Sequence, residues 1–351
     1  MHRIVAGVAA VAAGALLVAG CSSGSSSTSS TSPGATGSSS AADAAPVTVR
    51  LGFLANITHA PALIALKNGY FSQALGSAGT VKATEYSSGT QETTAILAGQ
   101  LDAAYVGPNP AINAWQKSNG TAIKIVSGAA TGGASIVVKP GIAGAAQLKG
   151  QSLATPSLGN TQDVALRYWL KQNGLTTSAT GGGDVAIKPT TPNSAAVLEF
   201  QSGQIAGASE PAPYDIEMVK DGGKVLLSEP GVTTVLMVTQ SFLSAHPAIV
   251  ADLLKANIQA INYIKTDPAA AEAAANAEYA AYSGKALKSS LVSASFKEIT
   301  FTVDPDASSL TTDAQQAVSV GLLKPVNLTG IFDLGPLNTL LTADDQPTVS
   351  G

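Results

Sequence analysis

Polar, uncharged side chains stand at the start of several predicted helices, directly after predicted strands. They are Asn56, Thr58, Ser87, Ser88, Thr90, Asn109, Asn160 and Thr161. Asn, Ser and Thr are residue types that cap helix N-termini, where unpaired backbone N–H groups and the positive end of the helix dipole attract anions. Several such loops together predict a site in which neutral donors and helix ends hold a small oxyanion. Taken singly, each residue could equally serve only to cap its own helix.

Charged residues contribute little to such a site. The chain has only three arginines: Arg3 lies in a predicted export signal, Arg50 at the start of a strand and Arg167 inside a helix. A bidentate arginine clamp on an anion is therefore not expected. Glu210 follows a predicted buried strand and precedes Pro211, where it would orient a loop or accept a hydrogen bond from a ligand amine. Glycines in the candidate loops either let the backbone approach a ligand closely or serve the turns alone. They are Gly89, Gly107, Gly132, Gly133 and Gly159.

The residues needed for catalysis or metal binding are scarce. The chain has three histidines and one cysteine, and it contains neither an HExxH nor a Gly-x-Ser-x-Gly pattern, whereas a catalytic zinc ion takes three protein ligands. His59 is the only histidine in a candidate loop. We therefore expect a protein without metal, cofactor or catalytic residues. An exported enzyme that uses His59 or Glu210 stays open as an alternative.

The composition is that of a folded protein with no nucleic-acid partner. Of the 351 residues, 45% are hydrophobic and 12% are charged, and the formal net charge is -4. The chain is too apolar to be disordered and too acidic to bind DNA or RNA. At roughly 150 residues per domain, its length predicts two domains.

Strand-like and helix-like segments alternate from residue 47 onward. Strands are predicted at residues 47–53, 81–86 and 101–106, and helices at residues 60–68, 91–98 and 110–117. This order predicts an α/β fold with largely parallel strands, in which small ligands bind beyond the carboxyl ends of the strands. The Ala-rich residues 247–282 predict two further helices, beginning at Pro247 and Pro268, that support one lobe.

A short internal repeat indicates two similarly built lobes. Residues 99–104 (GQLDAA) and 203–208 (GQIAGA) both follow a helix-like segment and run into a proline-containing loop, 104 residues apart. Two such units predict two lobes with a cleft between them. Leu54, Tyr86 and Trp115 would then either line an apolar part of the cleft or belong to the core.

Residues 1–20 predict an export signal. Arg3 is followed by an apolar run at residues 4–18, which is too short and too rich in Ala and Gly for a membrane span. Residues 17–21 (LVAGC) resemble the bacterial lipobox, in which the cysteine is lipidated and becomes the new N-terminus after cleavage. Residues 21–45 predict a Ser/Thr/Gly-rich tether, so we expect a lipid on Cys21 to anchor the body to the outer face of the cell membrane, in the cell envelope. A cleaved signal with a free thiol is the alternative.

As a group, the loops resemble those of a known family. The segments that carry the likeness are Leu51-Gly52-Phe53, His59-Ala60-Pro61-Ala62, Lys67-Asn68-Gly69-Tyr70-Phe71, Ser88-Gly89-Thr90-Gln91, Gly99-Gln100-Leu101-Asp102, Gly107-Pro108, Gly159-Asn160-Thr161 and Ser209-Glu210-Pro211. They are similar to the sulfonate/taurine/nitrate group of ABC-transporter substrate-binding proteins. The resemblance implies a two-lobed type II periplasmic-binding-protein fold with the ligand cleft between the lobes. Lobe I is expected at residues 46–134 and 239–351 and lobe II at residues 135–238, with crossovers near Ser135 and Thr239.

The donor-rich loops and the resemblance together give the expected ligand-binding residues. They are Asn56, His59, Ala60, Ser88, Gly89, Gly107, Pro108, Asn109, Gly133, Ser135, Asn160, Thr161 and Glu210. The resemblance further implies the extracytoplasmic solute-binding component of an ABC importer, a monomer that closes its lobes around a ligand and delivers it to a permease and its ATPase. The expected ligand is an aliphatic sulfonate, taken up for its sulfur. Nitrate, bicarbonate, a thiamine-type pyrimidine and a role as an envelope sensor are the alternatives.

Overall fold

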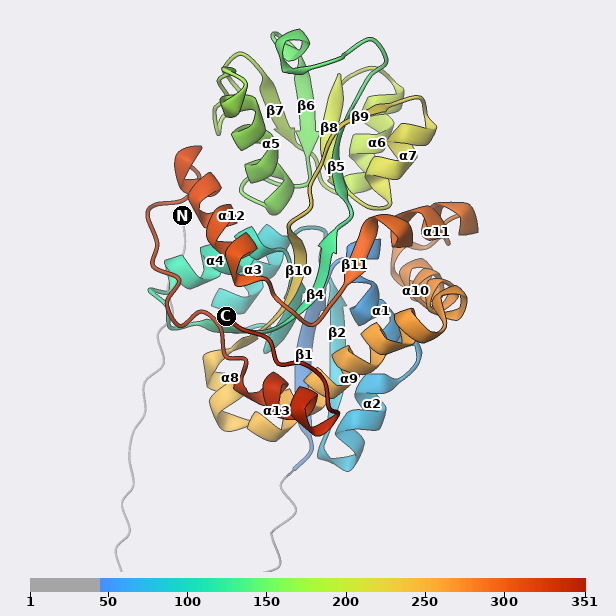
Figure 1. The fold of residues 1–351 in the computed structure, drawn as a ribbon, viewed down its shortest axis with the longest axis vertical. Helices are drawn as coiled ribbons and strands as arrows, with labels where there is room; N and C mark the ends of the chain where they lie inside the picture. The colour runs from blue at the N-terminus through green and yellow to red at the C-terminus, as the bar shows by residue number, and fades with distance from the viewer. Residues whose placement is uncertain (1–44) are drawn as a thin grey trace, which may run out of the picture. The chain divides into compact units, whose positions relative to one another are not determined.

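The computed structural model describes residues 45–351, which form one unit of the structure. The expected export signal, the lipidation site at Cys21 and all but the last residue of the tether lie outside the described residues. Figure 1 shows two β-sheets in this unit, each flanked by helices.

The first sheet has six strands in the order β11-β4-β10-β3-β1-β2. They are β1 (Val47–Phe53), β2 (Gly79–Glu85), β3 (Ala103–Val106), β4 (Ile123–Gly132), β10 (Val232–Thr239) and β11 (Ile299–Phe301). β1 pairs in parallel with β2 and β3, whereas β10 is antiparallel to β3 and β4. Since β1, β2 and β3 are parallel, their carboxyl ends meet at one edge, and the loops that follow them lie together.

The second sheet has five strands in the order β7-β6-β8-β5-β9. They are β5 (Ala134–Val138), β6 (Ser152–Thr155), β7 (Ala186–Pro189), β8 (Gly207–Pro211) and β9 (Lys224–Ser228). β6 pairs in parallel with β7 and β8, whereas β5 is antiparallel to β8 and β9. The loops after β6, β7 and β8 therefore also share one edge.

The two sheets have the same strand arrangement. In order and direction, β2-β1-β3-β10-β4 of the first sheet corresponds to β7-β6-β8-β5-β9 of the second. The two copies of the internal repeat, residues 99–104 and 203–208, lead into β3 and β8, which are corresponding strands. The prediction of two similarly built lobes is confirmed. We call the parts around the first and second sheets lobe I and lobe II.

Two connections join the lobes. β4 passes into β5 at Gly133, and β9 returns to β10 through residues 229–231. The boundary placed at Thr239 is wrong, because β10 is hydrogen bonded between β3 and β4, and residues 232–238 therefore belong to lobe I. Gly133 has a φ of 73°, and a Cβ there would collide with Ile299, so the first connection requires glycine.

The helices occupy the segments between strands and the C-terminal third. They are α1 (Ala60–Lys67), α2 (Tyr70–Leu75), α3 (Gly89–Leu97), α4 (Pro108–Lys117), α5 (Thr161–Gln172), α6 (Asn193–Gln201), α7 (Tyr214–Lys220), α8 (Gln240–Ala245), α9 (Pro247–Thr266), α10 (Pro268–Ser283), α11 (Ser289–Glu298), α12 (Ala307–Ser319) and α13 (Gly335–Ala343), with a 3-10 turn, η1 (Ile57–His59), before α1. α9 and α10 begin at the two predicted prolines and pack against α2 and α1 of lobe I, as expected.

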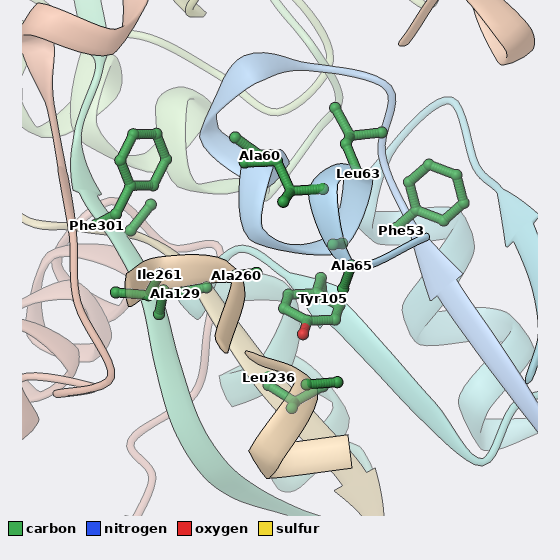
Figure 2. Close-up of a cluster of buried hydrophobic side chains, with 14 of the residues drawn as sticks. Phe53, Ala60, Leu63, Ala65, Tyr105, Ala129, Leu236, Ala260, Ile261 and Phe301 are labelled. Carbon is green, nitrogen blue, oxygen red and sulfur yellow. The ribbon is translucent and has the colours of Figure 1, made fainter. Parts of the chain in front are cut away.

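The main core of lobe I lies between its sheet and these helices. Figure 2 shows Phe53 of β1, Leu63 of α1, Tyr105 of β3, Leu236 of β10 and Ile261 of α9 as members of one cluster of buried side chains. The Tyr105 hydroxyl donates to Asn257 Oδ1 over 3.1 Å, so the polar end of this ring is also paired inside the core. This packing fixes the carboxyl ends of β1 and β3, from which the cleft loops extend.

Candidate functional site

A cleft of about 680 Å³ lies where the loops of the two lobes meet. Lobe I lines it with residues that follow β1, β2 and β3, and lobe II with residues that follow β6, β7 and β8. Of the expected ligand-binding residues, seven line it: Asn56, His59, Ser88, Gly89, Gly107, Asn160 and Thr161. The cleft therefore lies beyond the carboxyl ends of the strands in both lobes.

Several helices begin at the cleft, among them α3, α4 and α5. α3 begins at Gly89 after Ser88, α4 begins at Pro108 after Gly107, and α5 begins at Thr161 after Asn160. Ser88 Oγ accepts a hydrogen bond from Gln91 N over 3.4 Å, and Asn160 Oδ1 accepts one from Asp163 N over 2.9 Å. Both side chains thus cap their own helices, and what these helix starts offer a ligand is mainly backbone N–H groups and dipoles.

Helix starts from opposite lobes approach each other closely. A Cβ on Gly107 of lobe I would lie 2.6 Å from Thr161 Oγ1 of lobe II. Within the described residues, Thr161 Oγ1 is buried and has no hydrogen-bond partner. Nearby, Thr90 Oγ1 and Ser157 Oγ are 3.0 Å apart and also join the two lobes. The Thr161 hydroxyl is therefore available to a ligand at the point where the lobes meet.

His59 supplies a neutral donor to the cleft. Its Nδ1 accepts a hydrogen bond from Leu54 N over 3.2 Å, so the proton of the neutral ring is on Nε2. Burial lowers the pKa of His59 to about 3, because the charged ring would lose its hydration. At neutral pH the ring is uncharged, and its Nε2–H can donate to an acceptor.

Six expected residues lie outside the cleft wall: Ala60, Pro108, Asn109, Gly133, Ser135 and Glu210. Ala60 is in the lobe I core, and the Asn109 amide donates to the Asp313 carbonyl over 3.3 Å. Ser135 and Glu210 are paired residues of β5 and β8, and both are buried. β8 instead reaches the cleft through its last residue, Pro211.

Buried carboxyl groups gather behind the cleft rather than inside it. Burial raises the pKa of Asp215 to about 8 and that of Glu229 to about 7. Burial, together with the nearby charge of Asp215, raises the pKa of Glu210 well above its ordinary range. Ser209 Oγ donates to Glu229 Oε1 over 2.6 Å. Within residues 45–351, no group of three or more His, Cys, Asp or Glu side chains is placed to hold a metal ion.

The charged side chains that line the cleft balance one another. Three carboxyl groups and three ammonium groups are present: Glu85, Glu217, Asp221, Lys220, Lys285 and Lys288. Neither arginine of the described residues lines the cleft, since Arg50 pairs with Asp102 at 2.5 Å and Arg167 with Asp163 at 3.0 Å. The helix ends are then the main source of positive potential.

The Arg167–Asp163 pair holds a loop of the cleft. Asp163 accepts hydrogen bonds from Thr155 Oγ1 over 3.0 Å and from Gly159 N over 2.9 Å, while Arg167 Nε donates to its second oxygen, Oδ2, over 3.0 Å. Both side chains are fully buried. This network fixes the turn between β6 and α5 that ends in Asn160, so Arg167 shapes the cleft without touching it.

Four tyrosines line the cleft: Tyr86, Tyr214, Tyr279 and Tyr282. Of these four, only Tyr86 was predicted as a possible cleft residue. Leu54, predicted with it, also lines the cleft, whereas Trp115 is in the core of lobe I. The signal for two of the others was present, because Tyr279 and Tyr282 are three residues apart on one helix and share a face. Tyr214 comes from α7 of lobe II, and its hydroxyl donates to the Ala55 carbonyl over 3.2 Å.

The two sheets, their strand order and the cleft between their loops define a periplasmic-binding-protein fold. The chain belongs to the NMT1-like family, whose family model matches residues 42–278. None of the curated proteins matches it significantly in sequence. Within the described residues, no helix is both long and apolar enough to cross a membrane.

Solved structures with this fold include several binding components of import systems. The alkanesulfonate-binding protein SsuA from Xanthomonas axonopodis pv. citri, bound to MOPS, is 18% identical over 83% of this chain and 100% of that chain, with a TM-score of 0.69. The periplasmic nitrate-binding protein NrtA from Synechocystis PCC 6803 is 15% identical over 87% and 92%, with a TM-score of 0.72. The periplasmic aliphatic sulphonate binding protein SsuA from Escherichia coli is 18% identical over 78% and 86%, with a TM-score of 0.60.

Proposed function

We propose that this protein is the solute-binding component of an ABC importer and that it captures a small organic sulfonate between its lobes. The observation that carries the proposal is the meeting of three helix N-termini, those of α3, α4 and α5, at one cleft. A sulfonate is ionised at all physiological pH values and only accepts hydrogen bonds. It therefore matches backbone N–H groups, the Thr161 hydroxyl and the His59 Nε2–H.

The size of the cleft supports an organic ligand over an inorganic one. Cavities of about 300–1,000 Å³ are typical of sites for drug-sized molecules, and this cleft has about 680 Å³. Nitrate or bicarbonate would leave most of it to water. Two of the three structural neighbours named above are sulfonate-binding proteins, which supports this class of ligand, whereas the third is named for nitrate.

Lobe closure, rather than bond-making, is the proposed mechanism. The Nδ1 lone pair of His59 already accepts a hydrogen bond from Leu54 N and its pKa is lowered to about 3, while Glu210 lies outside the cleft wall, so neither is placed as a general base for a bound ligand. Within residues 45–351, the backbone crosses between the lobes only twice, at Gly133 and at residues 229–231. A ligand that contacts helix ends of both lobes favours the closed arrangement by the difference in its affinity for the two states.

The remaining features of the proposal concern the envelope. We infer a lipid on Cys21, a tether that holds a monomeric body at the outer face of the membrane, and delivery of the ligand to a permease and its ATPase. Mass spectrometry of the mature protein tests the lipid directly. The expected result is a lipid-modified cysteine at the N-terminus of the mature protein, and an unmodified N-terminus contradicts the anchor.

Thermal melting tests the ligand class. The protein is unfolded and refolded to remove carried-over ligand, then melted with methanesulfonate, hexanesulfonate, benzenesulfonate, nitrate and bicarbonate. A ligand at about 100 times its Kd stabilises the folded state by about 2.7 kcal/mol. Sulfonates are expected to raise the melting temperature, and Thr161→Val, which keeps the side-chain shape without the hydroxyl, is expected to reduce the rise. No shift with any sulfonate contradicts the proposal.

A further inference from the structure

The helix N-termini account for only one end of the cleft. A sulfonate head has few atoms, and the volume of about 680 Å³ leaves room for a larger body attached to it. The rest of the wall includes four tyrosines together with Leu54, Leu287 and Leu291. The side chains of this second wall therefore determine which organic group, attached to the sulfonate head, the cleft can accommodate.

Two of the tyrosines gather beside the ends of β1 and β2. Tyr86 N donates to the Phe53 carbonyl over 2.9 Å, which holds Tyr86 next to β1. Tyr282 of α10 packs its ring edge-to-face on Phe53, with the centroids 4.8 Å apart and the rings at 83°. Tyr86 is also only two residues before Ser88, the cap of α3. The aromatic wall therefore adjoins the anion-binding helix ends.

The other two tyrosines continue this wall across the cleft. Tyr279 is one turn before Tyr282 on α10, and its hydroxyl is 3.4 Å from that of Tyr214 on α7 of lobe II. Tyr214 and Tyr279 are nearly buried, whereas Tyr282 is 39% exposed. An apolar ring that remains exposed in a cleft gains from being covered by a ligand.

Aromatic side chains favour a planar ring over a flexible chain. Edge-to-face and offset ring pairs contribute about 0.5–1.5 kcal/mol beyond the area they bury. A flexible alkyl tail, in contrast, loses rotational freedom when it is bound. The Phe53–Tyr282 pair offers a ligand ring an existing aromatic cluster to join.

We propose that the ligand carries an aromatic ring on its oxyanion group, and that Tyr86, Tyr279 and Tyr282 select this ring. The inference rests on the proposed function for the head group and names the class of the body. It replaces the aliphatic tail expected from the sequence. The lysines and carboxylates at the cleft balance in number, so the body of the ligand needs no further charge.

Titration calorimetry on the refolded full-length protein tests the inference. Benzenesulfonate and hexanesulfonate have the same head group and the same number of carbons. We expect benzenesulfonate to bind about 2-fold to 13-fold more tightly, which is the ring-pair contribution expressed as a ratio of Kd values. Tyr282→Leu is expected to remove this preference and to leave the Kd of hexanesulfonate within about 2-fold, while Tyr282→Phe keeps the preference because the ring is retained.

A matched control separates the cleft from general effects of losing a tyrosine. Tyr168 lies on α5 outside the cleft wall, so Tyr168→Leu is expected to bind both ligands as the wild type does. Equal affinities for the two sulfonates, or equal losses for both in Tyr282→Leu, overturn the aromatic inference and leave the proposed function standing. Binding of uncharged benzenesulfonamide without binding of any sulfonate supports the aromatic wall and rejects the head group. No binding of any sulfonate or ring compound, with the protein folded, overturns both.

Discussion

Replacing Arg167 by methionine is expected to destabilise the protein strongly. The guanidinium is 1% exposed and the Asp163 carboxylate 0%, so the substitution leaves a buried carboxylate with only Thr155 and Gly159 as donors outside its own helix. Breaking a buried pair from one side costs about 3–5 kcal/mol. With an unfolding entropy of about 2.1 cal/mol/K per residue, a unit of this size loses about 5–8 °C in melting temperature.

Calorimetric melting of Arg167→Met checks this magnitude, and Arg50→Met is the matched control. Arg50 also pairs with an aspartate, Asp102, but its side chain is 44% exposed, so its loss is expected to cost about 0–1 kcal/mol. The double variant Asp163→Leu/Arg167→Met removes both charges and is expected to recover part of the stability. Sulfonate affinity is also expected to fall in Arg167→Met, because the turn before α5 loses its support. An Arg167→Met protein that melts and binds as the wild type does refutes the reasoning.

Three further predictions follow from the cleft and its surroundings. Gly107→Ala places a Cβ 2.6 Å from Thr161 Oγ1. Since overpacking costs about 1–3 kcal/mol, calorimetry is expected to show that this variant binds sulfonate at least about 5-fold more weakly. Gly144→Ala, whose added Cβ meets no atom within 4 Å, is the control and is expected to bind as the wild type does. Burial raises the pKa of Asp215 from 3.8 to about 8. The stability that the protonated carboxyl group contributes is therefore present below pH 3.8 and is lost as the pH rises toward 8. Between pH 5 and 8, the melting temperature of Asp215→Asn is expected to fall less than that of the wild type. The pKa of His59 is lowered to about 3, so the ring contributes no change in sulfonate affinity between pH 5 and 8, and a titration step near pH 6.5 that disappears in His59→Gln contradicts this.

Much of the fold was predictable because short sequence patterns determine where its strands and helices begin and end. The first strand has the predicted bounds, Val47–Phe53, and the helices from Pro247 and Pro268 begin where predicted. Alternating runs and prolines at first turns are local signals, so they need no knowledge of distant contacts. The internal repeat was short, yet it marked corresponding strands of the two lobes.

The membership of β10 was not predictable from local signals. Val232–Thr239 is nearly all buried and reads as a strand, but its partners β3 and β4 are more than a hundred residues earlier in the chain. The sequence of a buried strand predicts that it is a strand but does not indicate which sheet it joins. The second connection between the lobes was therefore placed at the wrong end of β10.

The cleft likewise contains residues that local sequence patterns predicted and residues that they did not. Donor-rich loops after strands identified Ser88, Gly107 and Thr161, because the carboxyl ends of parallel strands converge. Glu210 was assigned to the ligand from its position after a strand, yet it is a buried strand residue with its side chain outside the cleft wall. Tyr214 was missed because it comes from α7, whose approach to the cleft depends on long-range packing.

The most direct test of the central claim is a distance between the lobes, measured with and without ligand. In a Cys21→Ala background, spin labels on cysteines introduced at the exposed positions Lys117 of lobe I and Lys149 of lobe II report this distance by pulsed electron paramagnetic resonance. The account predicts that a sulfonate concentration that raises the melting temperature also narrows and shifts the distance distribution toward one closed state. An unchanged distribution at that concentration contradicts capture by closure of the two lobes.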